Sequence, residues 1–149
     1  MTDIRDILKQ TQEKWGEETV RAIIRKLQSY PVYWKGTLQR SIIYDISGDE
    51  VEFFMADYGR FIDEGTGRFG PRKTPIPKSS IPGIAFGLKS WVKSKNLNEW
   101  AVATNIVKRG GTKPKPFFKS VIESRIPLLG EAITNAYSEY LKSVVENNK

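Results

Sequence analysis

Apolar residues near the start of the chain recur at spacings of three, four and seven, which is typical of one amphipathic helix. Thr2 or Asp3 can cap this helix, and Pro31 ends it because proline disfavours helical geometry at the residue before it. Gly16 lies near its middle and costs about 1 kcal/mol against alanine, so we expect a bend or break there. The apolar stripe comprises Ile4, Ile7, Leu8, Trp15, Ile23, Ile24 and Leu27.

A second long helix is predicted at the other end of the chain, from about Phe117 to Val145. Pro127 is expected to interrupt it, since proline removes a backbone donor from the helix interior. Its apolar residues are Val121, Ile122, Leu128, Leu129, Ile133, Ala136, Tyr137, Leu141 and Val144.

Between the helices, two short runs rich in β-branched and aromatic residues predict a hairpin, from Ser41 to Ile46 and from Val51 to Met55. The intervening Ser-Gly-Asp-Glu is a turn signal. Because side chains alternate along a strand, one face is expected to carry Ile42, Tyr44 and Ile46, and the other Ile43 and Asp45.

The segment from Gly65 to Gly87 reads as loop, and two short helices are predicted after it, Ala85 to Lys93 and Glu99 to Val107. Asn98 is a suitable cap for the second, and Gly110-Gly111 would stop it. The pattern predicts an α+β fold, with the C-terminal helix packed on a small antiparallel sheet. We expect residues 1–149 to form a single domain that carries a basic loop-and-helix insert at residues 68–116.

Charge is distributed very unevenly along the 149 residues, whose formal net charge is +7. Residues 1–67 have a net charge of −3 and residues 120–149 of −1, whereas residues 68–119 hold twelve basic side chains against one acid, Glu99. A basic block of this kind is either a solvated face or the contact for a polyanion, meaning nucleic acid or an acidic protein surface.

The chain has no Cys and no His, which excludes disulfides, thiolate chemistry, His-based acid–base catalysis and Cys/His zinc sites. Asp63 and Glu64 could suggest a carboxylate pair, but neighbours in sequence point apart and chelate poorly. Gly65-Thr66-Gly67 lacks the Gly-Lys-Ser/Thr ending of a phosphate-binding loop and is better read as a tight turn. We therefore expect no enzyme, no catalytic residue, no metal and no cofactor.

Three segments, taken in chain order, resemble the head–tail joining or tail-completion proteins of long-tailed double-stranded DNA bacteriophages. Residues 35–42, Lys-Gly-Thr-Leu-Gln-Arg-Ser-Ile, are similar to that family's Thr-Gly-x-Leu-x-x-Ser-Ile, with the first two residues exchanged. Residues 58–66, Tyr-Gly-Arg-Phe-Ile-Asp-Glu-Gly-Thr, resemble Tyr-Ala-x-x-Val-Glu-x-Gly-Thr. Residues 115–118, Lys-Pro-Phe-Phe, resemble the Arg-Pro-Phe-Leu that leads into the last helix.

The resemblance implies a non-enzymatic virion component, assembled in the host bacterial cytoplasm and located in the neck or tail. It would form a homo-oligomeric ring, expected to be a hexamer, that joins the tail tube protein to a head-completion or adaptor protein around the DNA channel. The alternative is a small basic DNA-binding or packaging accessory protein. No apolar run approaches the ~20 residues of a membrane span, and no membrane partner is expected.

The candidate site residues fall into three groups. The family-like turn is Tyr58, Gly59, Asp63, Glu64, Gly65, Thr66 and Gly67. The entry to the last helix is Pro116, Phe117 and Phe118. The basic contact segment, expected to become ordered on assembly, contains Arg68, Arg72, Lys73, Lys78, Lys108, Arg109, Lys113 and Lys115.

Overall fold

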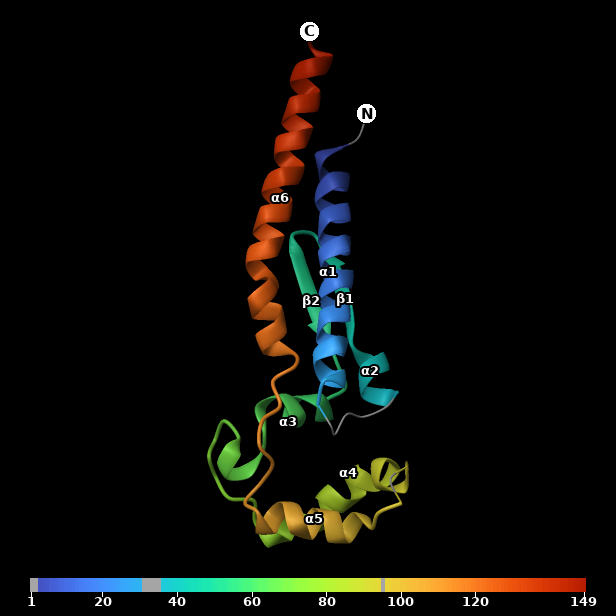
Figure 1. Cartoon of the computed structure of the whole chain (residues 1–149), viewed down its shortest axis with the longest axis vertical. Coiled ribbons are helices and arrows are strands. Elements are labelled where there is room, and N and C mark those ends of the chain that lie inside the picture. The colour runs from blue at the N-terminus through green and yellow to red at the C-terminus, as the bar shows by residue number, and fades with distance from the viewer. Residues whose placement is uncertain (1–2, 31–35, 95) are drawn as a thin grey trace. The chain divides into compact units, whose positions relative to one another are not determined.

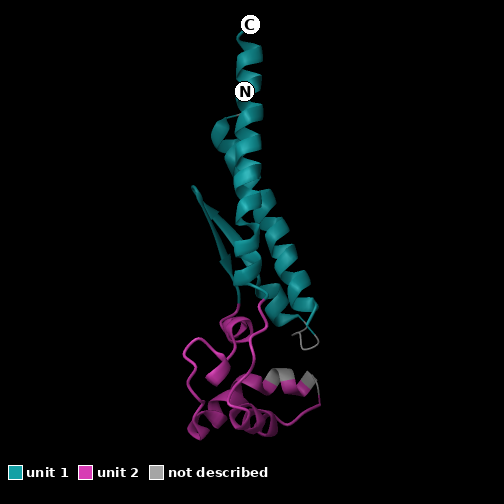
Figure 2. Ribbon diagram, turned by 60° about the vertical axis from the view of Figure 1, so that its left-hand side comes forward, with its two compact units in different colours: residues 1–55, 117–149 teal, residues 56–116 magenta. Residues whose placement is uncertain are grey.

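The computed structural model describes residues 3–30, 36–94 and 96–149, and it has the predicted α+β composition. The chain forms two compact units, which Figure 2 shows in different colours. Unit 1 combines residues 1–55 with 117–149, and unit 2 comprises residues 56–116, so the basic segment predicted at 68–116 lies within unit 2.

Helix α1 (Ile4–Gln28) begins at the predicted cap, where the Asp3 carboxylate accepts a hydrogen bond from the Arg5 N–H at 3.0 Å. Of the bend or break predicted at Gly16, the break is wrong, because α1 is continuous through it. A Cβ at Gly16 would lie 2.7 Å from the Tyr44 ring, so this glycine allows the helix backbone to approach the sheet closely. Pro31, the predicted end of the helix, lies outside the described residues.

Helix α6 (Lys119–Asn147) runs antiparallel to α1, and the two lie side by side in unit 1 (Figure 1). The Trp15 indole N–H donates to the Arg125 carbonyl at 2.9 Å, and the Arg125 guanidinium donates to the Thr19 hydroxyl at 3.0 Å. The main partner of α6 is therefore α1, whereas the sequence predicted that it would pack on the sheet.

Pro127 lies inside α6 without interrupting it, contrary to prediction. Both Pro127 and Glu123, four residues before it, are exposed, so water can satisfy the carbonyl that loses its helical partner. No α6 residue is fully buried, and Leu128, Leu141 and Val144 of the predicted apolar set are exposed. Among the described residues of unit 1, the buried apolar side chains are Trp15, Ile23, Leu27, Leu38, Ile42 and Phe117.

A short helix, α2 (Thr37–Ser41), occupies residues just before the sheet, so the first strand begins two residues later than predicted. Strands β1 (Ile43–Ser47) and β2 (Glu50–Phe54) pair antiparallel as the expected hairpin. Tyr44 and Ile46 are half-buried and Ile43 and Asp45 exposed, as the alternation predicted. The inner face contacts α1, where the Trp15 and Phe53 rings meet edge to face at 5.6 Å.

Unit 2 contains helices α3 (Tyr58–Glu64), α4 (Ile81–Ser94) and α5 (Glu99–Lys108), and the short 3₁₀ segments η1 (Gly67–Phe69) and η2 (Lys78–Ser80). Helix α4 begins four residues before the predicted Ala85, since proline is tolerated in a first helical turn. The predicted Asn98 cap of α5 is confirmed, because its side chain accepts from the Trp100 and Ala101 N–H groups. Helices α4 and α5 pack together over the buried residues Ala85, Val92 and Ala103.

Among the described helices, none is both long enough and apolar enough to cross a membrane.

Candidate functional site

The family-like segment forms a helix rather than the predicted turn. Residues Tyr58–Glu64 are α3, and the segment leaves helical geometry at Gly65, with φ 79° and ψ 176°, and at Thr66, which is extended. Gly59 and Asp63 are buried, while the Glu64 carboxylate lies 3.3 Å from the Arg60 guanidinium. Burial raises the pKa of the Tyr58 phenol above its usual value of 10.0. The segment is thus a small, structured element that leads into the glycines.

Asp63 and Glu64 lie in different surroundings. One is buried and the other pairs with Arg60, which is what adjacent helical positions, about 100° apart, predict. Among the residues described, no three His, Cys, Asp or Glu side chains gather in a way that could hold a metal ion.

Two glycine- and threonine-rich segments, 65–68 and 110–112, join in what we call the glycine–threonine clasp. The Thr66 N–H donates to the Thr112 carbonyl at 2.9 Å, and the Arg68 N–H donates to the Gly110 carbonyl at 2.8 Å. The Thr112 N–H donates back to the Thr66 hydroxyl at 2.9 Å, and the two threonine hydroxyls lie 2.8 Å apart. The clasp closes the base of the segment between residues 68 and 110.

Glycine is required in the clasp for both conformation and space. Gly65, Gly67, Gly110 and Gly111 all have positive φ, which L-residues with a side chain rarely adopt. A Cβ at Gly67 would lie 2.0 Å from the Gly110 carbonyl oxygen, and one at Gly111 would lie 2.0 Å from the Thr66 carbonyl oxygen. The backbone segments 65–68 and 110–112 can approach this closely only because Gly67 and Gly111 have no side chain at the points of contact.

The clasp also brings together two of the three family-like segments. The Lys115 N–H donates to the Ile62 carbonyl at 2.9 Å, which ties the third segment to α3 in the second. A Cβ at Gly65 would lie 2.9 Å from the Pro114 nitrogen, so these backbones are also in close contact. Beyond Pro116, Phe117 is fully buried and its ring lies 6.3 Å from that of Phe118, immediately before α6.

The basic residues of unit 2 gather partly around the clasp. The Arg68 guanidinium lies 4.7 Å from the centre of the Phe69 ring, and the Lys113 ammonium lies 6.0 Å from it, so the two ends of the basic segment share one aromatic ring. Arg72 and Lys73 follow in an exposed turn in which the Lys73 N–H donates to the Gly70 carbonyl.

The remaining predicted cations are not all placed at the clasp. Lys108 and Arg109 are exposed at the end of α5, next to Gly110, and Lys115 is half-buried beyond it. Lys78 lies in η2, at the start of the α4–α5 pair. None of the described Lys and Arg side chains from 68 to 115 forms an ion pair with a described carboxylate.

Sequence reasoning identified Gly65-Thr66-Gly67 as a turn but missed its partner, Gly110-Gly111-Thr112. The available signal was the recurrence of two similar Gly/Thr triplets on either side of the basic segment. Comparisons with protein-family models, with curated proteins and with solved structures find no match. The functional interpretation therefore depends on the residues of this chain.

Proposed function

We propose that this chain is a head–tail joining or tail-completion protein of a long-tailed DNA bacteriophage, which forms a ring between the tail tube and a head-completion protein. The observation that carries the proposal is the meeting of two family-like segments in one built element. The Lys115 N–H to Ile62 carbonyl bond and the close contact of Gly65 with Pro114 give both segments a shared structural role.

The charge distribution is the second support for a ring. A ring needs a heterologous interface, in which two different patches of one subunit meet different copies. Unit 1 has a net charge of −1 and carries four carboxylates on its hairpin, whereas unit 2 has a net charge of +8 and contains the basic segment, which forms no ion pairs with described carboxylates. Complementary potentials of this kind favour specific association and set its orientation. The protein carries out no reaction in this proposal; its function is docking.

The test is complementation in a phage that encodes this chain. With the gene inactivated, we expect filled heads and separate tails, and we expect the wild-type chain supplied in trans to restore joined virions. Gly111→Ala, which would disrupt the clasp, should fail to restore joining, whereas Gly87→Ala, with open space around its Cβ, should succeed. Joined virions in the absence of the protein would contradict the proposal.

A DNA-binding or packaging accessory protein is the alternative, favoured by the unpaired cations and by Trp100, whose side chain is 52% exposed instead of part of a core. Titration with duplex DNA separates the two functions. A DNA binder should bind with micromolar or tighter affinity that falls steeply with salt, because phosphate contacts release counterions. The joining function predicts weak DNA binding and incorporation into virions.

A further inference from the structure

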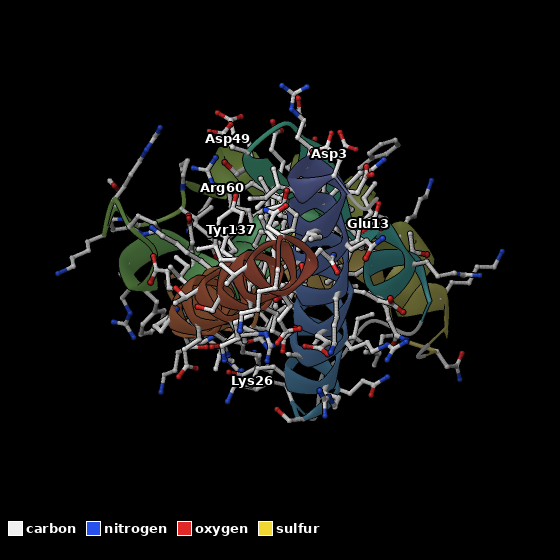
Figure 3. The ribbon with its side chains drawn as sticks, turned by 90° about the horizontal axis from the view of Figure 1, so that it is seen from above. Asp3, Glu13, Lys26, Asp49, Arg60 and Tyr137 are labelled. Carbon is white, nitrogen blue, oxygen red and sulfur yellow. The ribbon has the colours of Figure 1, made fainter. Side chains whose placement is uncertain are left out.

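The outer face of the hairpin combines exposed apolar side chains with unpaired carboxylates. Ile43 and Phe54 lie directly opposite each other and are 55% and 44% exposed. Next to them Asp45 lies opposite Glu52, and Glu50 follows at the end of the same face. Asp49 adds a fourth carboxylate in the turn between the strands, where Figure 3 labels it. None of these four carboxylates forms an ion pair with a described cation.

This face is unfavourable for an isolated chain. Like charges directly opposite on neighbouring strands destabilise a sheet, and an apolar pair that stays exposed forgoes most of the free energy that burial would give. The sequence has no Lys or Arg between Arg40 and Arg60, and Lys9 of α1, which lines the same surface hollow as Asp45, forms no ion pair with it. The combination is typical of a surface that another molecule covers.

The charge of the outer hairpin face disfavours contact with a second hairpin and favours contact with a cationic surface. Two hairpins packed face to face by a two-fold axis would bring the carboxylates of both copies together, so a symmetric pairing is disfavoured. The complementary surface on the same chain is the cationic cluster at the clasp, which we define as Arg68, Phe69, Arg72, Lys73 and Lys113. It pairs an aromatic ring with cations, as the hairpin pairs apolar residues with carboxylates.

We infer that the outer hairpin face of one copy docks on the cationic cluster of a second copy. The contact joins two different surfaces, so each subunit offers one free hairpin and one free cluster to further neighbours. The inference deepens the proposed function and rests on it only for the expectation that copies of the chain associate.

The experiment uses two full-length charge-reversal variants and their mixture, with mass measured by native mass spectrometry and light scattering. The hairpin variant is Asp45→Lys, Glu50→Lys and Glu52→Lys, which keeps a like-charge pair across the strands and so leaves hairpin stability nearly unchanged. The cluster variant is Arg72→Glu, Lys73→Glu and Lys113→Glu, all at exposed positions.

We expect the wild-type chain to be oligomeric and each variant alone to associate at least tenfold more weakly. Mixing the two variants should restore the oligomer, with the two kinds of subunit alternating, because every hairpin then meets a cluster of opposite charge. A control, Lys89→Glu and Lys93→Glu, reverses two exposed cations of unit 2 that lie outside the predicted contact segment, and this variant should still associate.

Several outcomes would overturn the inference. Oligomers that survive both reversals, or a wild-type chain that stays monomeric, show that this contact does not join copies. A third variant combines both reversals in one chain. If this variant associates but the mixture of the two single variants does not, the hairpin and the cluster meet within one copy. The proposed function is tested separately by complementation. Recovery of the oligomer on mixing can therefore succeed while virion joining fails, and virion joining can succeed while recovery on mixing fails.

Discussion

The two units of this protein are held together in different ways. Unit 1 buries large apolar side chains, including Trp15, Ile23 and Leu27 of α1, against α6 and the hairpin. Unit 2 buries only Ala85, Val92 and Ala103 among its described apolar side chains, and its base is closed by hydrogen bonds between two glycine-rich backbone segments. Burial of apolar side chains is therefore the main source of stability in unit 1, whereas unit 2 depends on backbone hydrogen bonds and on glycine conformation.

The two units should therefore differ in the substitutions that they tolerate. A side-chain core accepts changes that keep its volume, because packing depends on shape and burial. A backbone clasp accepts no added atom at its contact points, however small, because the neighbouring group is a carbonyl that cannot move aside.

Gly67→Ala should have the largest effect on stability, and the loss should fall on unit 2. The new Cβ meets the Gly110 carbonyl oxygen at 2.0 Å at a residue with φ 63°, so closing the clasp should cost roughly 3–5 kcal/mol more. Hydrogen exchange should then show loss of protection at the amides of Thr66, Arg68 and Thr112. Gly83→Ala is the control, because its Cβ meets nothing within 4 Å in α4, and it should stabilise that helix slightly. An unchanged clasp in Gly67→Ala would refute this account of unit 2.

Ile23→Ala tests unit 1 in the same way. Ile23 is fully buried, so the substitution should lower the free energy of unfolding by about 3 kcal/mol through lost burial and a cavity. Urea denaturation followed by Trp fluorescence gives the value, with Val145→Ala as a control at a position 60% exposed. If the amides of Thr66 and Thr112 lose the same protection as those of α1, the two units unfold as one block and the contrast between them fails.

Thr66→Val isolates the side-chain contribution to the clasp. It keeps the shape but removes the hydroxyl that accepts from the Thr112 N–H and meets the Thr112 hydroxyl. We expect unit 2 to lose roughly 1–2 kcal/mol, since a partly buried donor loses its partner. Thr104→Val, exposed on α5, is the matched control and should have little effect on exchange at the clasp. Equal effects of the two variants would show that the threonine pair contributes nothing specific.

Asp45→Asn should have the smallest effect and the opposite sign. Removing one of two facing carboxylates should stabilise the isolated hairpin by roughly 0.2–0.5 kcal/mol, and the gain should shrink with added salt. Denaturation at low protein concentration measures it, with Glu50→Gln as a control because Glu50 faces Ser47. A loss of stability would mean that Asp45 already has a favourable partner within the chain.

Local signals predicted the parts of the fold that depend on local interactions. The Asp3 and Asn98 caps, the hairpin and α5 are found close to where the sequence placed them, because caps, turns and strand alternation act over a few residues. The breaks predicted at Gly16 and Pro127 are absent: close packing of Gly16 against Tyr44 favours a continuous α1, and at the exposed Pro127 water can satisfy the freed carbonyl of α6. Helix α2 was missed because it has only five residues and no side-chain cap.

The candidate site was predicted only in part for a similar reason. Gly65-Thr66-Gly67 was correctly singled out as a place where glycine conformation matters. Its partner, 45 residues further along, could not be assigned, because no sequence rule states which two glycine-rich segments will share hydrogen bonds. The grouping of Arg68 with Lys113 around Phe69 follows from that same pairing.

By itself the amino-acid sequence determined that the chain is an α+β protein with long terminal helices, a hairpin and a basic middle segment, because periodicity, turn residues and charge are local properties. Only the tertiary structure decided that α6 packs along α1 and that the clasp closes the basic segment. These arrangements join residues far apart in the chain, and long-range contacts depend on the packing of whole elements.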